Sequence, residues 1–213
     1  MTTPIAVLLS GRGSNFLALQ AAIESGELPA RVVLVASNLE DAPGLKRARE
    51  LGLTALAVPH RHEPSRAVHE AKLISALAAS GAEWICLAGY MRLLSADFVR
   101  RFDRRILNIH PSLLPAFPGL DAQRQALEAG VKVSGCTVHF VDAGLDSGPI
   151  VVQRVVPVLE EDDTAALARR ILAEEHRAYP DALRRLILER WSIAGRTVRF
   201  DRTPARENSS PGG

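Results

Sequence analysis

The sequence predicts an α/β protein with a doubly wound, mostly parallel sheet and a late antiparallel hairpin. Short apolar runs alternate with amphipathic helical segments through the first half of the chain, as in IAVLLS followed by NFLALQAAIESG. Glycine or proline marks most of the junctions. Further along, two apolar runs follow one another without a helix between them. Alternation of strands and helices is typical of parallel sheets, and two consecutive strands are typical of a hairpin.

The first half is expected to contain five strands and four helices. Gly26 suits the end of the first helix, and Pro43 suits the start of the second. Ser95 is an expected N-cap, with Asp97 in the first turn of its helix. The expected strands are 5–10, 31–37, 54–59, 84–89 and 106–110, and the expected helices are 15–26, 43–52, 65–80 and 95–102.

The second half begins with the expected hairpin, strands 134–142 and 149–158, joined by the loop AGLDSG. Helices are predicted at 163–177 and 180–190, and a small hairpin at 191–200. We expect residues 1–200 to form a single domain. Residues 201–213 are polar and rich in Pro, Gly and Ser, which predicts a disordered tail.

The composition is that of an ordinary soluble globular protein, with 47% hydrophobic and 23% charged residues in 213 and a formal net charge of +2. No basic run, long apolar span or signal peptide is evident, so neither a nucleic acid nor a membrane is an expected partner. Cys86 and Cys136 lie in apolar segments and are expected to be buried thiols in a reducing cytoplasm. His60 and His62 indicate a solvated loop rather than a metal site, and no metal is expected.

Asn108 and His110 interrupt the apolar strand ILNIH. Residues two apart in a strand face the same side of the sheet. Burying either side chain without a partner costs about 1–3 kcal/mol. A polar pair satisfied by backbone groups is one explanation. A pair on one face at a strand exit, where α/β proteins bind ligands, favours a functional site.

The loop SGRGSN, residues 10–15, joins the first strand to the first helix. Backbone amides at a helix N-terminus bind anions, and glycines permit close approach. No Lys-Ser/Thr follows, and Phe16 stands where a dinucleotide loop has its third glycine, so a nucleoside triphosphate or NAD is not expected. The loop fits a single phosphate group on a small substrate. A tight turn capped by Ser14 or Asn15 is equally consistent with this loop alone.

Asp142 and Asp146 lie in or beside the loop between the two late strands. Turn formation alone explains aspartate at such positions. A carboxylate that reached His110 would in addition orient the imidazole ring and favour its protonated form.

Six motifs taken together, SGRGSN, AGYMRLLS, LNIHPSLLPAFPG, GCTVHFV, LDSGPI and EEHRAYP, resemble the phosphoribosylglycinamide formyltransferase family. The resemblance runs in order along the chain to about residue 190. It implies a formyltransferase-like fold and formyl transfer from 10-formyltetrahydrofolate to the amine of glycinamide ribonucleotide, in de novo purine biosynthesis. It also implies a cytoplasmic enzyme of one-carbon metabolism, as a monomer or a homodimer.

The resemblance also implies site residues. Asn108, His110 and Asp146 match the family's catalytic positions, and Asn108 also matches a folate-binding one. Glu175 matches a position that holds the substrate's ribose hydroxyls. The substrate phosphate is assigned to Gly13, Ser14 and Asn15, and the folate to Arg66, Met91, Arg92, Leu93 and Leu94.

The chain departs from the family's pattern at several positions. Arg12 stands where Asn is common and adds a cation to the phosphate loop. Ser147 replaces the glycine after the catalytic aspartate, which predicts a less mobile loop. Asp121 and Gln123 stand where some relatives have histidines, so a pH-dependent ordering of that loop does not carry over.

Three rival functions give different expectations. A formyl-folate hydrolase would carry an additional N-terminal regulatory domain, for which a first strand at Ile5 leaves no room. A methionyl-tRNA formyltransferase would carry a further C-terminal RNA-binding domain, which we do not expect in 213 residues. A non-catalytic folate- or nucleotide-binding module would bind ligand without turnover.

Overall fold

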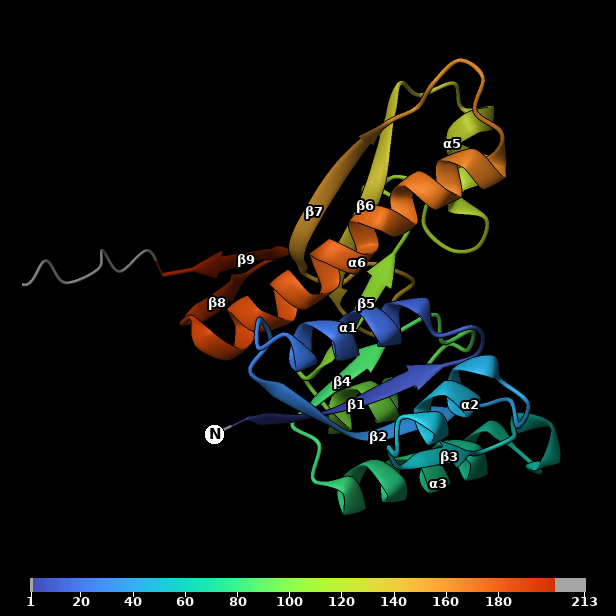
Figure 1. Cartoon of the computed structure of the whole chain (residues 1–213), viewed down its shortest axis with the longest axis vertical. Coiled ribbons are helices and arrows are strands. Elements are labelled where there is room, and N and C mark those ends of the chain that lie inside the picture. Colours follow the sequence, from blue (N-terminus) through green and yellow to red (C-terminus); the bar gives the residue numbers. More distant parts are fainter. Residues whose placement is uncertain (1, 202–213) are drawn as a thin grey trace, which may run out of the picture.

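The computed structural model describes residues 2–201, and its backbone is organised around one nine-stranded sheet (Figure 1). The strand order is β3-β2-β1-β4-β5-β6-β7-β9-β8. The strands are β1 (Thr3–Leu9), β2 (Ala30–Ser37), β3 (Ala55–Ala57), β4 (Trp84–Leu87), β5 (Ile106–His110), β6 (Val133–Phe140), β7 (Ile150–Pro157), β8 (Trp191–Ala194) and β9 (Thr197–Phe200).

Six α-helices and one short 3₁₀ helix connect these strands within residues 2–201. They are α1 (Ser14–Glu24), α2 (Pro43–Glu50), η1 (His60–His62), α3 (Arg66–Ser80), α4 (Ala96–Arg101), α5 (Ala122–Glu128) and α6 (Thr164–Leu188).

The first five strands are all parallel, and the chain order reverses at β1, which pairs with both β2 and β4. Ligands of open parallel sheets bind outside the carboxyl ends of the strands beside such a reversal. The carboxyl ends of β1, β4 and β5 therefore define the edge of the sheet on which a site is expected.

The antiparallel part begins at β6, which pairs with β5 in a register that sets Asn108 opposite His139. β7 returns antiparallel to β6, which confirms the predicted late hairpin. The predicted hairpin at 191–200 is also confirmed as β8 and β9. β9 joins the edge of the same sheet through a parallel pairing of Thr197 with Ile150. The predicted fold class is therefore confirmed.

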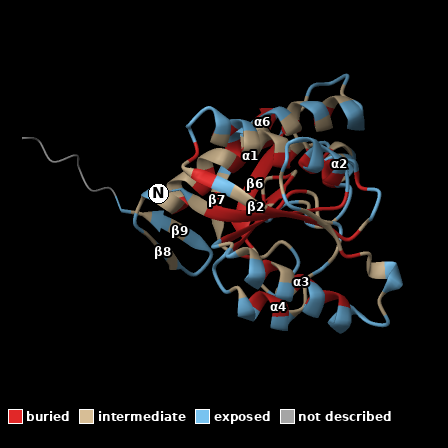
Figure 2. Ribbon diagram, turned by 60° about the horizontal axis from the view of Figure 1, so that its bottom comes forward, coloured by how far each residue is buried: buried red, intermediate tan, exposed pale blue. Residues whose placement is uncertain are grey.

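Helices cover both faces of the sheet, with α1, α2 and α6 on one face and α3 and α4 on the other (Figures 1 and 2). Successive residues of β1 point to opposite faces of the sheet and pack in different apolar clusters. Ile5, Val7 and Leu9 belong to the larger apolar cluster, which includes residues of α1, α2 and α6. Ala6 and Leu8 belong to the cluster with residues of α3 and α4. A strand buried on both faces explains the unbroken apolar run IAVLL.

The helices of the first half form where they were predicted, with ends that differ by a few residues. Ser95 is the N-cap of α4, and its Oγ accepts a hydrogen bond from the backbone N–H of Phe98 at 3.1 Å. The third strand is shorter than the predicted 54–59, because the chain enters η1 at His60.

The prediction of two helices, at 163–177 and 180–190, is wrong, because α6 is one helix of 25 residues with Pro180 inside it. Proline removes one helical hydrogen bond and usually breaks a helix. Here Tyr179 and Leu183 are fully buried on either side of the proline. Packing of a continuous apolar face against the sheet therefore outweighs the local cost.

Helix α5 was not predicted, and it lies in the segment between β5 and β6. It has only seven residues and starts after Asp121, whose φ is +56°. Its buried residues Ala122 and Ala126 give only a weak apolar pattern. Residues 202–213 of the expected tail lie outside the described residues.

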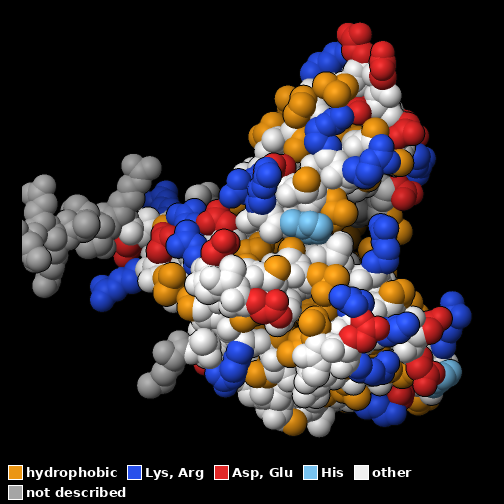
Figure 3. Space-filling view, in the orientation of Figure 1, with side chains coloured by type: hydrophobic (Ala, Val, Ile, Leu, Met, Phe, Trp, Pro, Cys, Tyr) orange, Lys and Arg blue, Asp and Glu red, His pale blue; other side chains and the backbone are white. Residues whose placement is uncertain are grey.

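The surface carries charges of both signs. Lys and Arg side chains are interspersed with Asp and Glu on the face drawn in Figure 3. Among residues 2–201, no helix is both long enough and apolar enough to cross a membrane.

Candidate functional site

His110 is the last residue of β5, and its imidazole is almost fully buried, with 6% of the side chain exposed. Its Nδ1 lies 3.4 Å from Oδ2 of Asp146, at ion-pair distance. Its Nε2 lies 2.9 Å from the backbone carbonyl oxygen of Phe117. Both ring nitrogens face acceptors, and only the doubly protonated imidazolium can donate to both.

Asp146 reaches His110 from the loop between β6 and β7, where its backbone has a φ of +49°. The same Oδ2 accepts a hydrogen bond from the backbone N–H of Gly119 at 2.8 Å. Asp142, at the start of this loop, makes its hydrogen bonds within the loop. Its Oδ1 accepts hydrogen bonds from the N–H of Gly144 at 3.1 Å and from Oγ of Ser147 at 2.7 Å. Asp142 therefore stabilises the turn that presents Asp146.

His139 completes this cluster and was not assigned a role from the sequence. It lies opposite Asn108 across the β5–β6 pairing, and its Nε2 is 3.2 Å from Nδ2 of Asn108 and 3.7 Å from Oδ1 of Asp146. Its Nδ1 lies 2.8 Å from the Phe140 carbonyl oxygen. The Phe140 carbonyl oxygen accepts a hydrogen bond from Nδ1–H of His139. In the neutral ring Nε2 then has no proton, and it accepts a hydrogen bond from one N–H of the Asn108 amide.

Burial lowers the pKa of His139, and the nearby His110 acts in the same direction, while the Phe140 carbonyl and Asp146 partly oppose them. The neutral ring is therefore favoured. The signal for His139 was available in principle, since strand pairing of ILNIH with GCTVHFV brings the two polar residues together. The sequence alone does not supply the register.

The phosphate-loop candidates Gly13 and Ser14 lie at the start of α1. Gly13 is the N-cap in the left-handed conformation, with φ +74°, and no side chain caps the helix. The alternative, a turn capped by the side chain of Ser14 or Asn15, is therefore wrong. A Cβ on Gly13 would lie 3.1 Å from Cα of Gly44 and 3.2 Å from Leu9 Cδ2. The loop is packed against α2. Because no side chain caps α1, its first backbone amides are candidates to bind an anion.

Asn15 and Glu175 are in direct contact although 160 residues separate them. Nδ2 of Asn15 donates to Oε2 of Glu175 at 2.7 Å, and both residues are more than nine-tenths buried. Burial raises the pKa of Glu175, and the hydrogen bond from Asn15 partly opposes that rise. Among the described residues, Oδ1 of Asn15 is buried and has no hydrogen-bond partner.

The folate candidates Met91 to Leu94 form an irregular segment between β4 and α4. The side chains of Met91 and Leu93 are exposed, at 68% and 67%. The N–H of Met91 donates to Oγ of Ser10 at 2.8 Å, which ties this segment to the phosphate loop. Nη2 of Arg66, from α3, donates to the Leu93 carbonyl oxygen at 2.7 Å. Arg92 and Leu94 are half-buried.

The three groups of candidates thus share one edge of the sheet. The phosphate loop follows β1, the segment 91–94 follows β4, and His110 ends β5. Because these strands are parallel neighbours, their carboxyl ends adjoin. The direct hydrogen bond of Ser10 to Met91 joins the first two groups, and the β6–β7 loop brings Asp146 to the third.

Neither cysteine belongs to this cluster. Cys86 and Cys136 are free, buried thiols, and burial raises the pKa of each to about 12. A thiol with so high a pKa is a poor nucleophile at neutral pH. His60 is hydrogen-bonded through Nδ1 to the Asn38 carbonyl at 3.0 Å. Residues 2–201 contain no group of three or more His, Cys, Asp or Glu residues placed to hold a metal ion.

Asn108, His110 and Asp146 meet at the carboxyl end of β5, and the loop that begins α1 lies at the same edge of the sheet. The sequence pattern of the formyl transferase family matches residues 3–183. The chain therefore belongs to the formyl transferase family.

Individual relatives give the same result. The trifunctional purine biosynthetic protein adenosine-3 of Drosophila melanogaster is 52% identical over 185 residues, which cover 86% of this chain but only 14% of that protein. The phosphoribosylglycinamide formyltransferase of Bacillus subtilis is 39% identical over 182 residues, 85% of this chain and 93% of that one.

Solved structures of similar proteins agree with this assignment. The crystal structure of glycinamide ribonucleotide transformylase 1 from Symbiobacterium toebii has a TM-score of 0.91 at 54% identity, and covers 93% of this chain and 94% of that one. The match includes both the parallel and the antiparallel part of the sheet.

Proposed function

We propose that this chain transfers the formyl group of 10-formyltetrahydrofolate to the amine of glycinamide ribonucleotide. The observation that carries the proposal is the convergence of Asn108, His110 and Asp146 at the carboxyl end of β5. They lie on the sheet edge that also holds an anion-binding helix terminus and an open, apolar segment. The relatives of similar length named above act in this reaction class.

In the proposed reaction the substrate amine attacks the formyl carbon, and the carbonyl oxygen becomes an oxyanion. A preorganised donor aimed at such an oxygen contributes about 3–4 kcal/mol. The Asn108 amide has two N–H groups, of which one is held by His139. The second is the neutral donor to the oxyanion. His110 in its protonated form is the charged donor, and the Asp146 carboxylate faces its Nδ1.

The Phe117 carbonyl occupies Nε2 of His110 in this structure. For Nε2 to donate to the oxyanion, that hydrogen bond has to be exchanged for one to the substrate. The loop that follows β5 therefore has to shift locally when the ternary complex forms.

The proton balance of the reaction requires one transfer. The new bond joins the amine nitrogen to the formyl carbon, and the bond from that carbon to the folate N10 breaks. The attacking amine loses a proton, and N10 gains one. His110, or a water beside Asp146, is placed to carry it. No protein atom is formylated in this scheme, and the buried cysteines have no role in it.

The substrate's phosphate is assigned to the start of α1, where Gly13, Ser14 and Asn15 offer backbone amides. The ribose hydroxyls are assigned to Glu175, whose carboxylate accepts from Asn15 and has capacity for further donors. Asn15 thus links the two parts of the substrate site. Arg12 adds a positive charge to the loop.

The folate is assigned to the segment Met91–Leu94 together with Arg66 and Asn108. Exposed apolar side chains and backbone groups of an irregular segment suit a flat ring with polar edges. We further propose that residues 1–200 act as one domain in the cytoplasm, as a monomer or homodimer, with no nucleic-acid or membrane partner.

The proposed function is tested by incubating the purified chain with 10-formyltetrahydrofolate, with and without glycinamide ribonucleotide. We expect tetrahydrofolate to be released only when the ribonucleotide is present, in a one-to-one ratio with the formylated product. Release of formate without the ribonucleotide would indicate a hydrolase. Binding of both ligands without turnover would indicate a non-catalytic module.

A further inference from the structure

We propose that Glu70 is a positioning residue, which fixes the conformation of the segment Met91–Leu94 through Arg66 and Ser95. This inference rests on the proposed function, because it assigns Glu70 to the binding of the folate. Glu70 lies on α3 and is not one of the residues that the family resemblance assigned.

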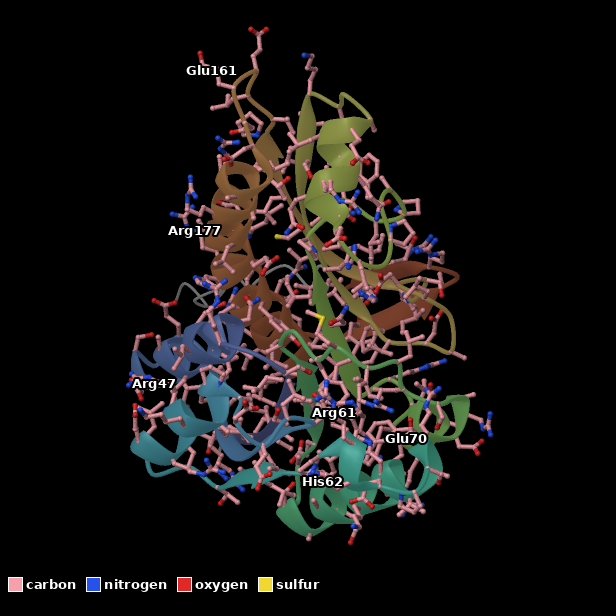
Figure 4. The ribbon with its side chains drawn as sticks, turned by 90° about the vertical axis from the view of Figure 1, so that its right-hand side faces the viewer. Arg47, Arg61, His62, Glu70, Glu161 and Arg177 are labelled. Atoms are coloured by element: carbon pink, nitrogen blue, oxygen red, sulfur yellow. The ribbon has the colours of Figure 1, made fainter. Side chains whose placement is uncertain are left out.

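Glu70 is a buried carboxylate, with 6% exposure, that collects hydrogen bonds from two elements. Its Oε1 accepts from Nε of Arg66 at 3.0 Å and from the N–H of Ser95 at 2.9 Å. Its Oε2 accepts from Oγ of Ser95. Figure 4 labels Glu70 on α3, beside the α4 region to which Ser95 belongs. One carboxylate therefore joins α3 to the start of α4.

Arg66 extends this link to the backbone of the segment. Its Nε is held by Glu70, and its Nη2 donates to the Leu93 carbonyl. An arginine side chain has many rotamers, so a carboxylate that holds Nε selects the one that reaches Leu93. Glu70 thus acts on the segment twice, directly at Ser95 and through Arg66 at Leu93.

Ser95 requires the same carboxylate for its cap. The hydroxyl has one proton, which it donates to Oε2 of Glu70. Its lone pairs are then directed to the N–H of Phe98, the acceptor role that caps α4. The start of α4 and the end of the segment are therefore set by one interaction.

Apart from the packing of Leu94 against the apolar cluster of α3 and α4, few contacts define the shape of the segment. Residues 91–94 have no helix or strand, and Met91 and Leu93 expose most of their side chains. The hydrogen bond from Met91 to Ser10 fixes one end. The contacts of Glu70 and Arg66 fix the other. A ligand that binds backbone groups of such a segment depends on both attachments.

The ionised form of Glu70 is the one that these contacts need. Burial opposes ionisation, but the hydrogen bonds from Ser95 and Arg66 outweigh it and hold the pKa of Glu70 below its ordinary value. Hydrogen bonds to a charged acceptor are stronger than those to a neutral one.

The test replaces Glu70 by glutamine, which keeps the shape and removes the charge. We expect the KM for 10-formyltetrahydrofolate and the Kd for tetrahydrofolate to rise about tenfold, the effect of losing one hydrogen bond to a charged group. The kcat and the KM for glycinamide ribonucleotide are expected to stay near parent values, the pattern of lost uniform binding. Glu50→Gln is the control, since Glu50 pairs with Arg47 on the surface of α2.

A double-mutant cycle identifies the route. If Glu70 acts through Arg66, Arg66→Met combined with Glu70→Gln costs less than the sum of the two single effects. Glu70→Asp keeps the charge but shortens the side chain, and we expect a smaller rise in the folate KM. If Glu70→Gln does not fold, the folate KM of Glu70→Asp tests whether Glu70 positions the segment.

The outcomes separate this inference from the proposed function. An active parent whose folate KM and Kd are unchanged by both Glu70 variants would overturn the inference alone. Equal losses in kcat and in both KM values would show a general structural role and would overturn it as well. An inactive parent would overturn the proposed function, while the tetrahydrofolate Kd would still report on Glu70.

Discussion

Oδ2 of Asp146 lies 3.4 Å from Nδ1 of His110, and the two residues come from different elements 36 positions apart. The carboxylate is held from the other side by the N–H of Gly119. Its geometry therefore depends on both loops that flank the carboxyl end of the sheet. This relationship gives the first prediction.

Asp146→Asn keeps the size of the side chain but removes the carboxylate charge that faces Nδ1 of His110. We expect kcat to fall on the order of 10²–10⁴-fold, the contribution of a positioned acid–base system. Steady-state kinetics with both substrates checks it. Asp142→Asn is the matched control in the same loop, and we expect it to be much milder. Equal losses in the two variants would mean that loop folding, rather than the His110 ion pair, is responsible.

The buried neutral His139 predicts a pH dependence of stability. Its pKa is below 6.5 in the folded protein, so the unfolded chain binds the proton more readily. The free energy of unfolding therefore falls as the pH drops below about 6.5, by at most about 1.4 kcal/mol per pH unit for one histidine. Above that pH the contribution is fully present. Urea titrations across this range measure it.

His139→Gln removes the titrating ring and keeps an acceptor for Asn108. We expect a flatter dependence of stability on pH in this variant than in the parent. Burial also lowers the pKa values of His69 and His176, so part of the slope remains. An unchanged slope would show that His139 is not a source of the acid sensitivity.

The phosphate loop predicts selective loss of one substrate. Gly13→Ala places a Cβ against Gly44 and Leu9 at a positive φ, which displaces the start of α1. We expect weaker binding of glycinamide ribonucleotide in calorimetry and unchanged binding of tetrahydrofolate. Gly26→Ala is the control, because Gly26 also has a positive φ but has nothing within 4 Å of an added Cβ. If both ligands weaken together, the assignment of the loop is wrong.

The raised pKa of Glu175 predicts how substrate binding responds to acid. A carboxylate accepts hydrogen bonds from ribose hydroxyls more strongly than a carboxylic acid does. As the pH falls through the raised pKa, Glu175 gains its proton at a higher pH than an exposed glutamate would. We expect the KM for glycinamide ribonucleotide to rise in that range. The rise is expected to be absent in Glu175→Gln, and its persistence there would assign it to another group.

The sequence predicted the elements whose signals are local. Ser95, the first residue of SADFVRRF, indicated a helix start. The apolar run of β5 with its two polar residues indicated a strand that ends at a site. These predictions depend on residues within one helical turn or one strand of each other, so the sequence alone contains the whole signal.

The failures concern interactions across the fold. Two helices were predicted around Pro180, but a buried face that includes Tyr179 and Leu183 packs against the sheet and keeps α6 continuous. His139 was not recognised, because its contact with Asn108 depends on the register of β5 with β6. The contact of Glu70 with Ser95 likewise gives no local signal, since Ser95 is 25 residues away. Only the pairing of Glu70 with Arg66, four residues earlier, is local.

The most direct test of the account follows the formyl carbon itself. 10-Formyltetrahydrofolate labelled with ¹³C at the formyl group is mixed with the purified chain and glycinamide ribonucleotide, and the reaction is followed by carbon NMR. We predict that the label moves from the folate to the amide of the ribonucleotide, without free formate. Label that appears in formate, or that stays on the folate while both ligands bind, would contradict the account.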